Sequence, residues 1–203
     1  MGEEFKFDNL QFSMLQELAN IGAGNAITSL SKLIGKEIGM DISNVQILSF
    51  NDTSTALGGA DMPVAAVIVN ISSDDIKGMV MFIIEIEKAL PLVGILMNKD
   101  INELDEIGKS ALNEIGNILI SSYTGALSTL FNSEIEITVP TLVIDMAGSI
   151  LSIPATEFAR VSDNALFIES IFNTNEKGIS GYFILIPDNN SFKFMFQKLG
   201  LKV

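Results

Sequence analysis

An internal repeat constrains the fold of this chain more than any other feature of its sequence. The segment Ser13-Met-Leu-Gln-Glu17-Leu-Ala-Asn20 returns 97 residues later as Ser110-Ala-Leu-Asn-Glu114-Ile-Gly-Asn117. In both segments a serine, a glutamate four residues on and an asparagine three further on interrupt an apolar, helix-like pattern. Residues three or four apart lie on one side of an α-helix, so each trio is expected to form a polar stripe.

The repeat continues beyond the two trios. Leu30-Ser31 matches Leu127-Ser128 at the same offset, and Ile76-Lys-Gly78 matches Ile179-Ser-Gly181 at an offset of 103. The sequence therefore predicts a tandem duplication, with repeats over about 8–99 and 102–203. We expect the halves to share one sheet or core about a pseudo-twofold axis, as a single domain over 1–203.

Each half is expected to contain a helix, three strands and a helix. In the first half these elements are a helix from Asp8 or Asn9 to Ile34, strands over 37–50, 62–71 and 78–86, and a helix over 87–98. In the second half they are a helix from Asn102 to Phe131, a strand region over 134–150 interrupted by Pro140, strands over 164–173 and 179–187, and a helix over 190–199. Consecutive strands favour an α+β fold over a parallel βαβ fold.

Two details of the first long helix also follow from its sequence. Its apolar stripe is expected to consist mainly of Leu15, Leu18, Ile21, Ile27, Leu30 and Ile34. The pair Gly22 and Gly24 lies inside the helical pattern, and a third glycine is missing, so a nucleotide-binding loop is disfavoured. Tight helix packing against Ala26 explains the pair better. Residues 51–61 are expected to form a polar, Gly-rich connection.

Composition excludes several classes of function. The chain has no cysteine, which removes disulfides and thiolate catalysis, and no histidine, which removes the commonest general base. Its net charge of −13 disfavours nucleic acid as a partner. Mean hydropathy is high at +0.41, but no apolar run approaches the ~18 residues that span a bilayer. The N-terminal residues lack a signal-peptide pattern, so we expect a cytoplasmic protein without membrane insertion.

The trios can serve chemistry that needs neither histidine nor cysteine. An asparagine amide is a poor nucleophile and a poor base, but it can both donate a hydrogen bond to a water and accept one from it. In phosphoryl transfer, orientation of the attacking water is a recognised contribution to catalysis. The alternative is that each trio is only a solvated helix surface. On the residues alone, the two interpretations are equally supported.

The pattern resembles the signature of the CheC/CheX/FliY phosphatase family of bacterial chemotaxis, and its CheC branch in particular. The resemblance rests on Ser110-xxx-Glu114-xx-Asn117 with Pro140 following, on Asn20-Ile-Gly-Ala-Gly-Asn25, and on Val139-Pro-Thr-Leu-Val-Ile-Asp145-Met. It covers nearly the whole chain. It implies hydrolysis of the phospho-aspartate of the response regulator CheY, with the deamidase CheD as a further partner.

The resemblance also implies residue roles. Asn20 and Asn117 would orient water, whereas Glu17 and Glu114 would contact the regulator's active-site lysine. Ser13, Ser110 and Pro140 would complete the motifs. No cofactor is implied on this chain, because the Mg²⁺ resides on the regulator.

The two motif copies differ at one position. Ser43 stands where the second half has Pro140, and proline restricts both its own φ and the residue before it. We therefore expect the second site to be the more active. The main alternative function is a non-catalytic flagellar-switch or CheD-binding adaptor module, and a nucleotide-binding enzyme is a distant third.

Overall fold

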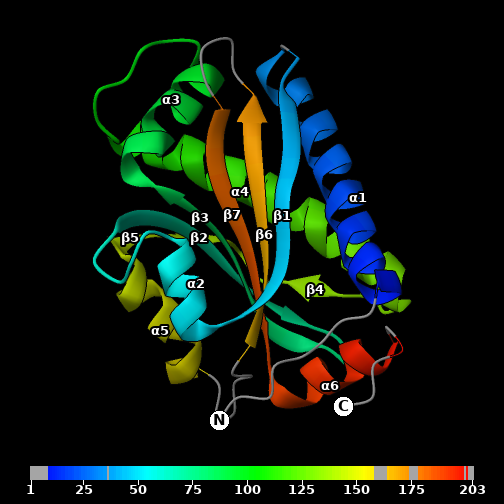
Figure 1. The fold of residues 1–203 in the computed structure, drawn as a ribbon. Helices are drawn as coiled ribbons and strands as arrows, with labels where there is room; N and C mark the ends of the chain where they lie inside the picture. The colour runs from blue at the N-terminus through cyan, green and yellow to red at the C-terminus, as the bar shows by residue number, and fades with distance from the viewer. Residues whose placement is uncertain (1–8, 36, 158–163, 174–177, 199, 201–203) are drawn as a thin grey trace.

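The strands of both halves of the chain join in one antiparallel sheet (Figure 1). The computed structural model describes residues 9–35, 37–157, 164–173, 178–198 and 200, so Asp8 lies outside the described residues. The strand order is β1-β6-β7-β3-β2-β4, and β5 also pairs with β2. The strands are β1 (Gly39–Ser49), β2 (Pro63–Ser72), β3 (Lys77–Glu85), β4 (Glu136–Ile137), β5 (Thr141–Met146), β6 (Asn164–Asn173) and β7 (Gly178–Pro187).

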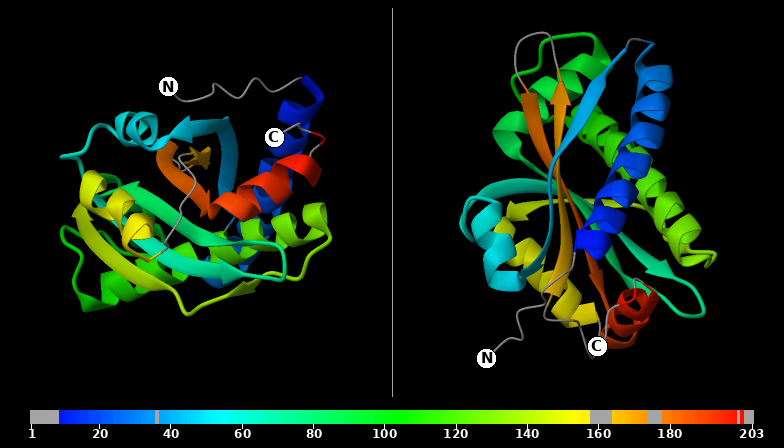
Figure 2. Two further views of the ribbon diagram at one scale, coloured as in Figure 1. Left: turned by 90° about the horizontal axis from the view of Figure 1, so that it is seen from below. Right: turned by 45° about the vertical axis from the view of Figure 1, so that its right-hand side comes forward.

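Helices cover both faces of this sheet. They are α1 (Asn9–Ile34), α2 (Phe50–Ala56), α3 (Ile86–Met97), α4 (Glu106–Phe131), α5 (Ala147–Glu157) and α6 (Asn189–Lys198). One core cluster joins α1, α3, α4 and α6 to one face, and a second joins α5 and Leu57 to the other. Figure 2 shows the long helices and the α2–α5 pair on opposite sides of the strands. The central strands are buried on both faces, which explains their continuous apolar sequences.

The pairing of the strands follows a pseudo-twofold axis. In the first half β1 pairs with β6, and in the second half β4 and β5, which together take the place of β1, both pair with β2. At the centre β3 pairs with β7, and Met81 lies opposite Ile184, which is its counterpart 103 residues later. The long helices α1 and α4 have 26 residues each and start 97 residues apart. This topology is consistent with the predicted duplication.

The same hydrogen bond also closes each long helix. The backbone N–H of Ile38 donates to Ser31 Oγ at 3.3 Å, and the N–H of Ile135 donates to Ser128 Oγ at 3.3 Å. Both pairs are related by the 97-residue offset. The repeat therefore preserves individual contacts as well as the order of elements.

The α+β fold class is confirmed, but each half contains one helix more than predicted. Residues 50–56 form α2, where a strand was expected to end at Phe50 and a loop to follow, because the Ser49 hydroxyl accepts a hydrogen bond from the Asp52 N–H and caps the helix. Residues 147–157 form α5, although the strand region was expected to continue to Ile150. There the buried residues are Ala147, Ile150, Leu151 and Pro154, spaced as on one helix face.

Two further boundaries differ from the prediction. The helix expected to begin at Asn102 begins at Glu106, because the Asp105 carboxylate caps it and accepts a hydrogen bond from the Gly108 N–H at 2.7 Å. In α1 most of the predicted stripe is buried or partly buried, but Ile21 is 46% exposed.

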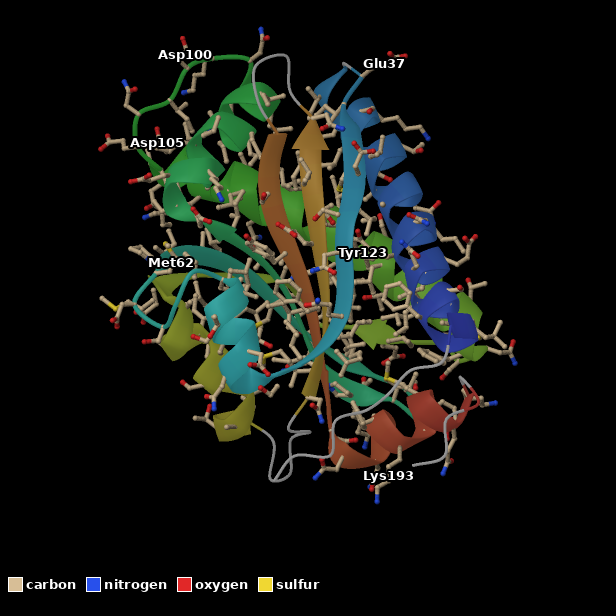
Figure 3. All side chains as sticks on the ribbon, viewed as in Figure 1. Glu37, Met62, Asp100, Asp105, Tyr123 and Lys193 are labelled. Atoms are coloured by element: carbon tan, nitrogen blue, oxygen red, sulfur yellow. The ribbon has the colours of Figure 1, made fainter. Side chains whose placement is uncertain are left out.

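Close helix packing explains one glycine of the α1 pair, Gly22, but not the other, Gly24. A Cβ on Gly22 would overlap the ring of Tyr123 from α4, so close helix packing explains this glycine, although its partner is Tyr123 and not Ala26. Nothing lies within 4 Å of a Cβ built on Gly24, so packing does not explain the second glycine. Tyr123 is 1% exposed, and its hydroxyl lies 3.1 Å from Ser170 Oγ (Figure 3).

Candidate functional site

The second motif lies on the outer face of the first half of α4. Ser110 and Glu114 are exposed and Asn117 is half-buried. The Ser110 hydroxyl donates to the Glu106 carbonyl at 2.9 Å and so remains part of the helix. Glu114 and Asn117 form no hydrogen bond or ion pair with any residue that the structure describes. Their carboxylate and amide therefore remain open to a group from another molecule.

The first motif has the same arrangement on α1. Ser13, Glu17 and Asn20 are all exposed, and neither Glu17 nor Asn20 forms a hydrogen bond or ion pair within the described ranges. The structure thus places each serine–glutamate–asparagine trio along one helix, as the spacing predicts. The two motifs lie on separate helices, which contact each other where Gly22 meets Tyr123.

Gly116, inside the second motif, allows α4 to approach the sheet closely. A Cβ at this position would overlap the side chain of Val67 on β2. Val67 pairs across the sheet with Leu142 of β5, which is two residues after Pro140. The Glu114–Asn117 segment therefore packs on β2 at Val67, and Pro140 precedes the strand that pairs with β2 at the same residue. The counterpart of Gly116 in the first half is Ala19, which is fully buried.

The position of Pro140 distinguishes the two halves. Pro140 is half-buried and lies in the break between β4 and β5, because proline has no N–H to donate to a strand ladder. Its counterpart Ser43 lies in a bulge of β1, where the register shifts between Ile42 and Asn44. The Ser43 hydroxyl donates to the Glu169 carbonyl at 3.3 Å. One half therefore keeps a continuous strand where the other is interrupted.

One pair of site-adjacent residues escaped the sequence interpretation. Leu10 is 70% exposed and Ile107 is 63% exposed, each seven residues before a motif glutamate. Both were hidden within apolar-rich helix sequence. The offset of 97 residues that relates them was the available signal.

The described residues show no metal site and no membrane-spanning helix, and they line a cavity away from the motifs. No group of three or more His, Cys, Asp or Glu side chains there is arranged to hold a metal ion. No helix in the described ranges is long and apolar enough to cross a membrane. A cavity of roughly 160 Å³ lies between β2, the β4–β5 segment and α5, lined by residues that include Asn70, Thr138 and Glu157. It contains none of the motif residues.

The two regions of the chain that match a protein-family model lie one in each half. The CheC-like family model matches residues 10–43 and 107–144. The chain is 32% identical over 197 residues to the CheY-P phosphatase CheC of Bacillus subtilis, covering 94% of each protein. Among solved structures, Thermotoga maritima FliY matches with a TM-score of 0.72 at 20% identity, covering 97% of this chain and 98% of FliY.

A further solved structure of this fold is a complex. The CheX–CheY–BeF₃–Mg²⁺ complex from Borrelia burgdorferi matches with a TM-score of 0.53 at 17% identity, covering 85% of this chain and 97% of that chain.

Proposed function

Because the chain belongs to the CheC-like family, we propose that it hydrolyses the phospho-aspartate of a CheY-like response regulator. The proposal assigns one site to α1 and one to α4. The observation that carries it is the presence of two equivalent glutamate–asparagine pairs, each on the outer face of a long helix. Neither pair is engaged by another described residue of this chain.

In the proposed reaction Asn20 or Asn117 positions a water in line with the phosphorus atom. The amide Nδ2 donates a hydrogen bond to the water and Oδ1 accepts one from it. The water oxygen bonds to phosphorus, the bond from phosphorus to the aspartate oxygen breaks, and the aspartate leaves as a carboxylate. The proton of the water departs with the inorganic phosphate. Because an acyl phosphate is already reactive, orientation and electrostatics suffice and no covalent intermediate on this chain is required.

Glu17 and Glu114 are proposed to dock the regulator. A carboxylate three residues before the asparagine lies about 4.5 Å away along the helix axis, at 1.5 Å per residue. The glutamate can therefore pair with a lysine ammonium of the regulator while the amide reaches the phosphoryl group. The Mg²⁺ that neutralises the phosphoryl oxygens belongs to the regulator in this proposal, in keeping with the CheX–CheY–BeF₃–Mg²⁺ composition of the Borrelia complex.

We propose that the α4 site is the more active. Asn117 is half-buried whereas Asn20 is exposed, so fewer conformations of the Asn117 amide must be restricted when the regulator binds. Gly116 seats this segment on β2, next to the strand that follows Pro140. The α1 site has the continuous, bulged β1 in place of that break.

Decay of phosphate from a Mg²⁺-bound regulator tests the proposal. Wild-type protein should accelerate the decay, and Asn117→Ala should slow it more than Asn20→Ala does. Loss of one positioning group removes about 2.7–4 kcal/mol of barrier stabilisation, or roughly 100- to 1000-fold at that site. The double variant should approach the decay rate of the regulator alone. Double-variant activity equal to wild type would disprove the assigned roles.

The second candidate function is a binding module without hydrolysis, which the fold shared with FliY supports. It predicts that the wild-type chain binds the regulator, or a CheD deamidase, without shortening the lifetime of the phosphate. A CheD-like partner is also compatible with the phosphatase, and co-purification of the two proteins would test that association.

A further inference from the structure

Two exposed aliphatic side chains extend the polar stripes of the long helices. Among the exposed large apolar residues of the described chain, only Leu10 and Ile107 occupy equivalent positions in the two halves. Each precedes a motif serine by three residues and a motif glutamate by seven. Exposed apolar residues scattered singly are ordinary, but here the exposure recurs at equivalent positions of the repeat, each beside a motif.

Helix geometry places these residues on the stripe of the motif. Seven residues make nearly two turns, so Ile107 lies within about 20° of the direction of Glu114 and roughly 10 Å from it along the axis. The same relation holds for Leu10 and Glu17. Each stripe therefore presents an aliphatic residue, a serine, a glutamate and an asparagine in succession. A flat partner that reaches the asparagine and the glutamate passes over the aliphatic residue as well.

The first turn of α4 holds Ile107 in a defined position. Asp105 caps this turn through Gly108, and Lys109 forms an ion pair with Glu106 at 2.8 Å (Figure 3 labels Asp105 at the start of α4). Gly108 is buried, and a Cβ built on it would lie 3.9 Å from Val93 of α3. The backbone of Ile107 is thus fixed on both sides while its side chain remains exposed. Little backbone conformational entropy is lost when a side chain on such a fixed backbone enters an interface.

We propose that Ile107 and Leu10 are specificity-determining contacts for the phosphorylated regulator. This inference rests on the proposed function, because the regulator is the occupant of the adjacent glutamate–asparagine pair. The regulator would have to present an apolar surface about 10 Å from the lysine that meets Glu114 or Glu17. A regulator with a charged residue there would be rejected, since burial of an unpaired charge is costly.

The test isolates each site and compares matched substitutions. In an Asn20→Ala background, Ile107→Ser should raise the KM for the phosphorylated regulator about tenfold and leave kcat nearly unchanged, because the contact stabilises ground state and transition state equally. Leu10→Ser should do the same in an Asn117→Ala background. Leu33→Ser is the control, because Leu33 is 48% exposed on α1 but lies about 160° around the helix from Glu17. Ile107→Leu should retain the wild-type KM.

The outcomes separate this inference from the function on which it rests. If the wild-type chain fails to accelerate phosphate decay, both proposals are wrong. If it accelerates decay but Ile107→Ser and Leu10→Ser change the KM no more than Leu33→Ser, the docking inference alone is wrong. A fall in kcat at unchanged KM would also overturn it, because that result would place Ile107 in the chemical step. Circular dichroism melts verify that each variant is folded.

Discussion

The substitution Gly116→Ala tests whether the stability of the fold depends on the close approach of α4 to the sheet. The added Cβ would lie 2.5 Å from Val67 Cβ and 2.8 Å from Val67 Cγ1. Carbon atoms in contact normally keep about 3.5–4.0 Å, so either α4 or β2 must move by roughly 1 Å. Overpacking of this kind costs about 1–3 kcal/mol. The loss exceeds the 0.5–1 kcal/mol that alanine gains over glycine within a helix.

Gly125→Ala on the same helix is the matched control. Nothing lies within 4 Å of a Cβ at Gly125, so this variant should be about 0.5–1 kcal/mol more stable than wild type. The free energies of unfolding of the two variants, from urea titrations, should therefore differ by about 1–3 kcal/mol. Combining Gly116→Ala with Val67→Ala should cost less than the sum of the two single changes, because each change makes room for the other.

The same displacement of α4 should also lower the proposed catalytic activity of its site. Gly116 lies between Glu114 and Asn117, and a misplacement of about 1 Å can cost on the order of 100-fold in rate. In an Asn20→Ala background Gly116→Ala should therefore lower regulator dephosphorylation strongly, and Gly125→Ala should not. Equal stabilisation by the two alanines, with unchanged dephosphorylation, would refute the reasoning from the α4–β2 contact.

Three further predictions concern α4. Burial raises the pKa of Tyr123 to about 12, from an unfolded value near 10, so its stabilising contribution is fully present below about pH 10 and falls by about 2 kcal/mol by pH 12. Tyr123→Phe should flatten this alkaline loss in pH-dependent urea titrations. Thr124→Val should raise stability by about 1 kcal/mol, because the buried Thr124 hydroxyl has no hydrogen-bond partner among the described residues; a lower thermal midpoint would contradict this. Asp105→Ala should cost about 1 kcal/mol by removing the cap on Gly108, whereas Asp105→Asn should keep most of it in the same melting assay.

Elements with a strong local pattern were predictable from the sequence. The long helices and the two strand pairs carry enough apolar residues at the right period for their cores to be recognised. The two short helices α2 and α5 were missed for different reasons. In α2 the sequence is polar, and the only local signal was Ser49 followed three residues later by Asp52. In α5 the apolar residues of β5 continue into the helix, and no turn separates the two elements.

The helix face on which each motif residue lies was predictable from the sequence, but the packing around the motifs was not. Repetition of the trio placed Glu17 and Glu114 on one helix face each, because that follows from spacing alone. The contact of Gly116 with Val67 joins a helix to a strand almost 50 residues away in the sequence, so local sequence does not predict it. The exposure of Leu10 and Ile107 likewise depends on which neighbours the fold supplies, and local sequence does not encode that choice.

The exchange of strands between the halves has a consequence for how the chain can be divided. Since β1 pairs with β6 and β5 with β2, neither half contains the neighbour of its own first strand. A fragment ending in the α3–α4 loop would leave open edges on β1, β2 and β3, because the partners β6, β5 and β7 all lie in the other half. Such fragments should remain unfolded or associate when separate, and should restore the native sheet when mixed. A single unit of half this length would meet the same need by pairing with a second copy of itself about a twofold axis.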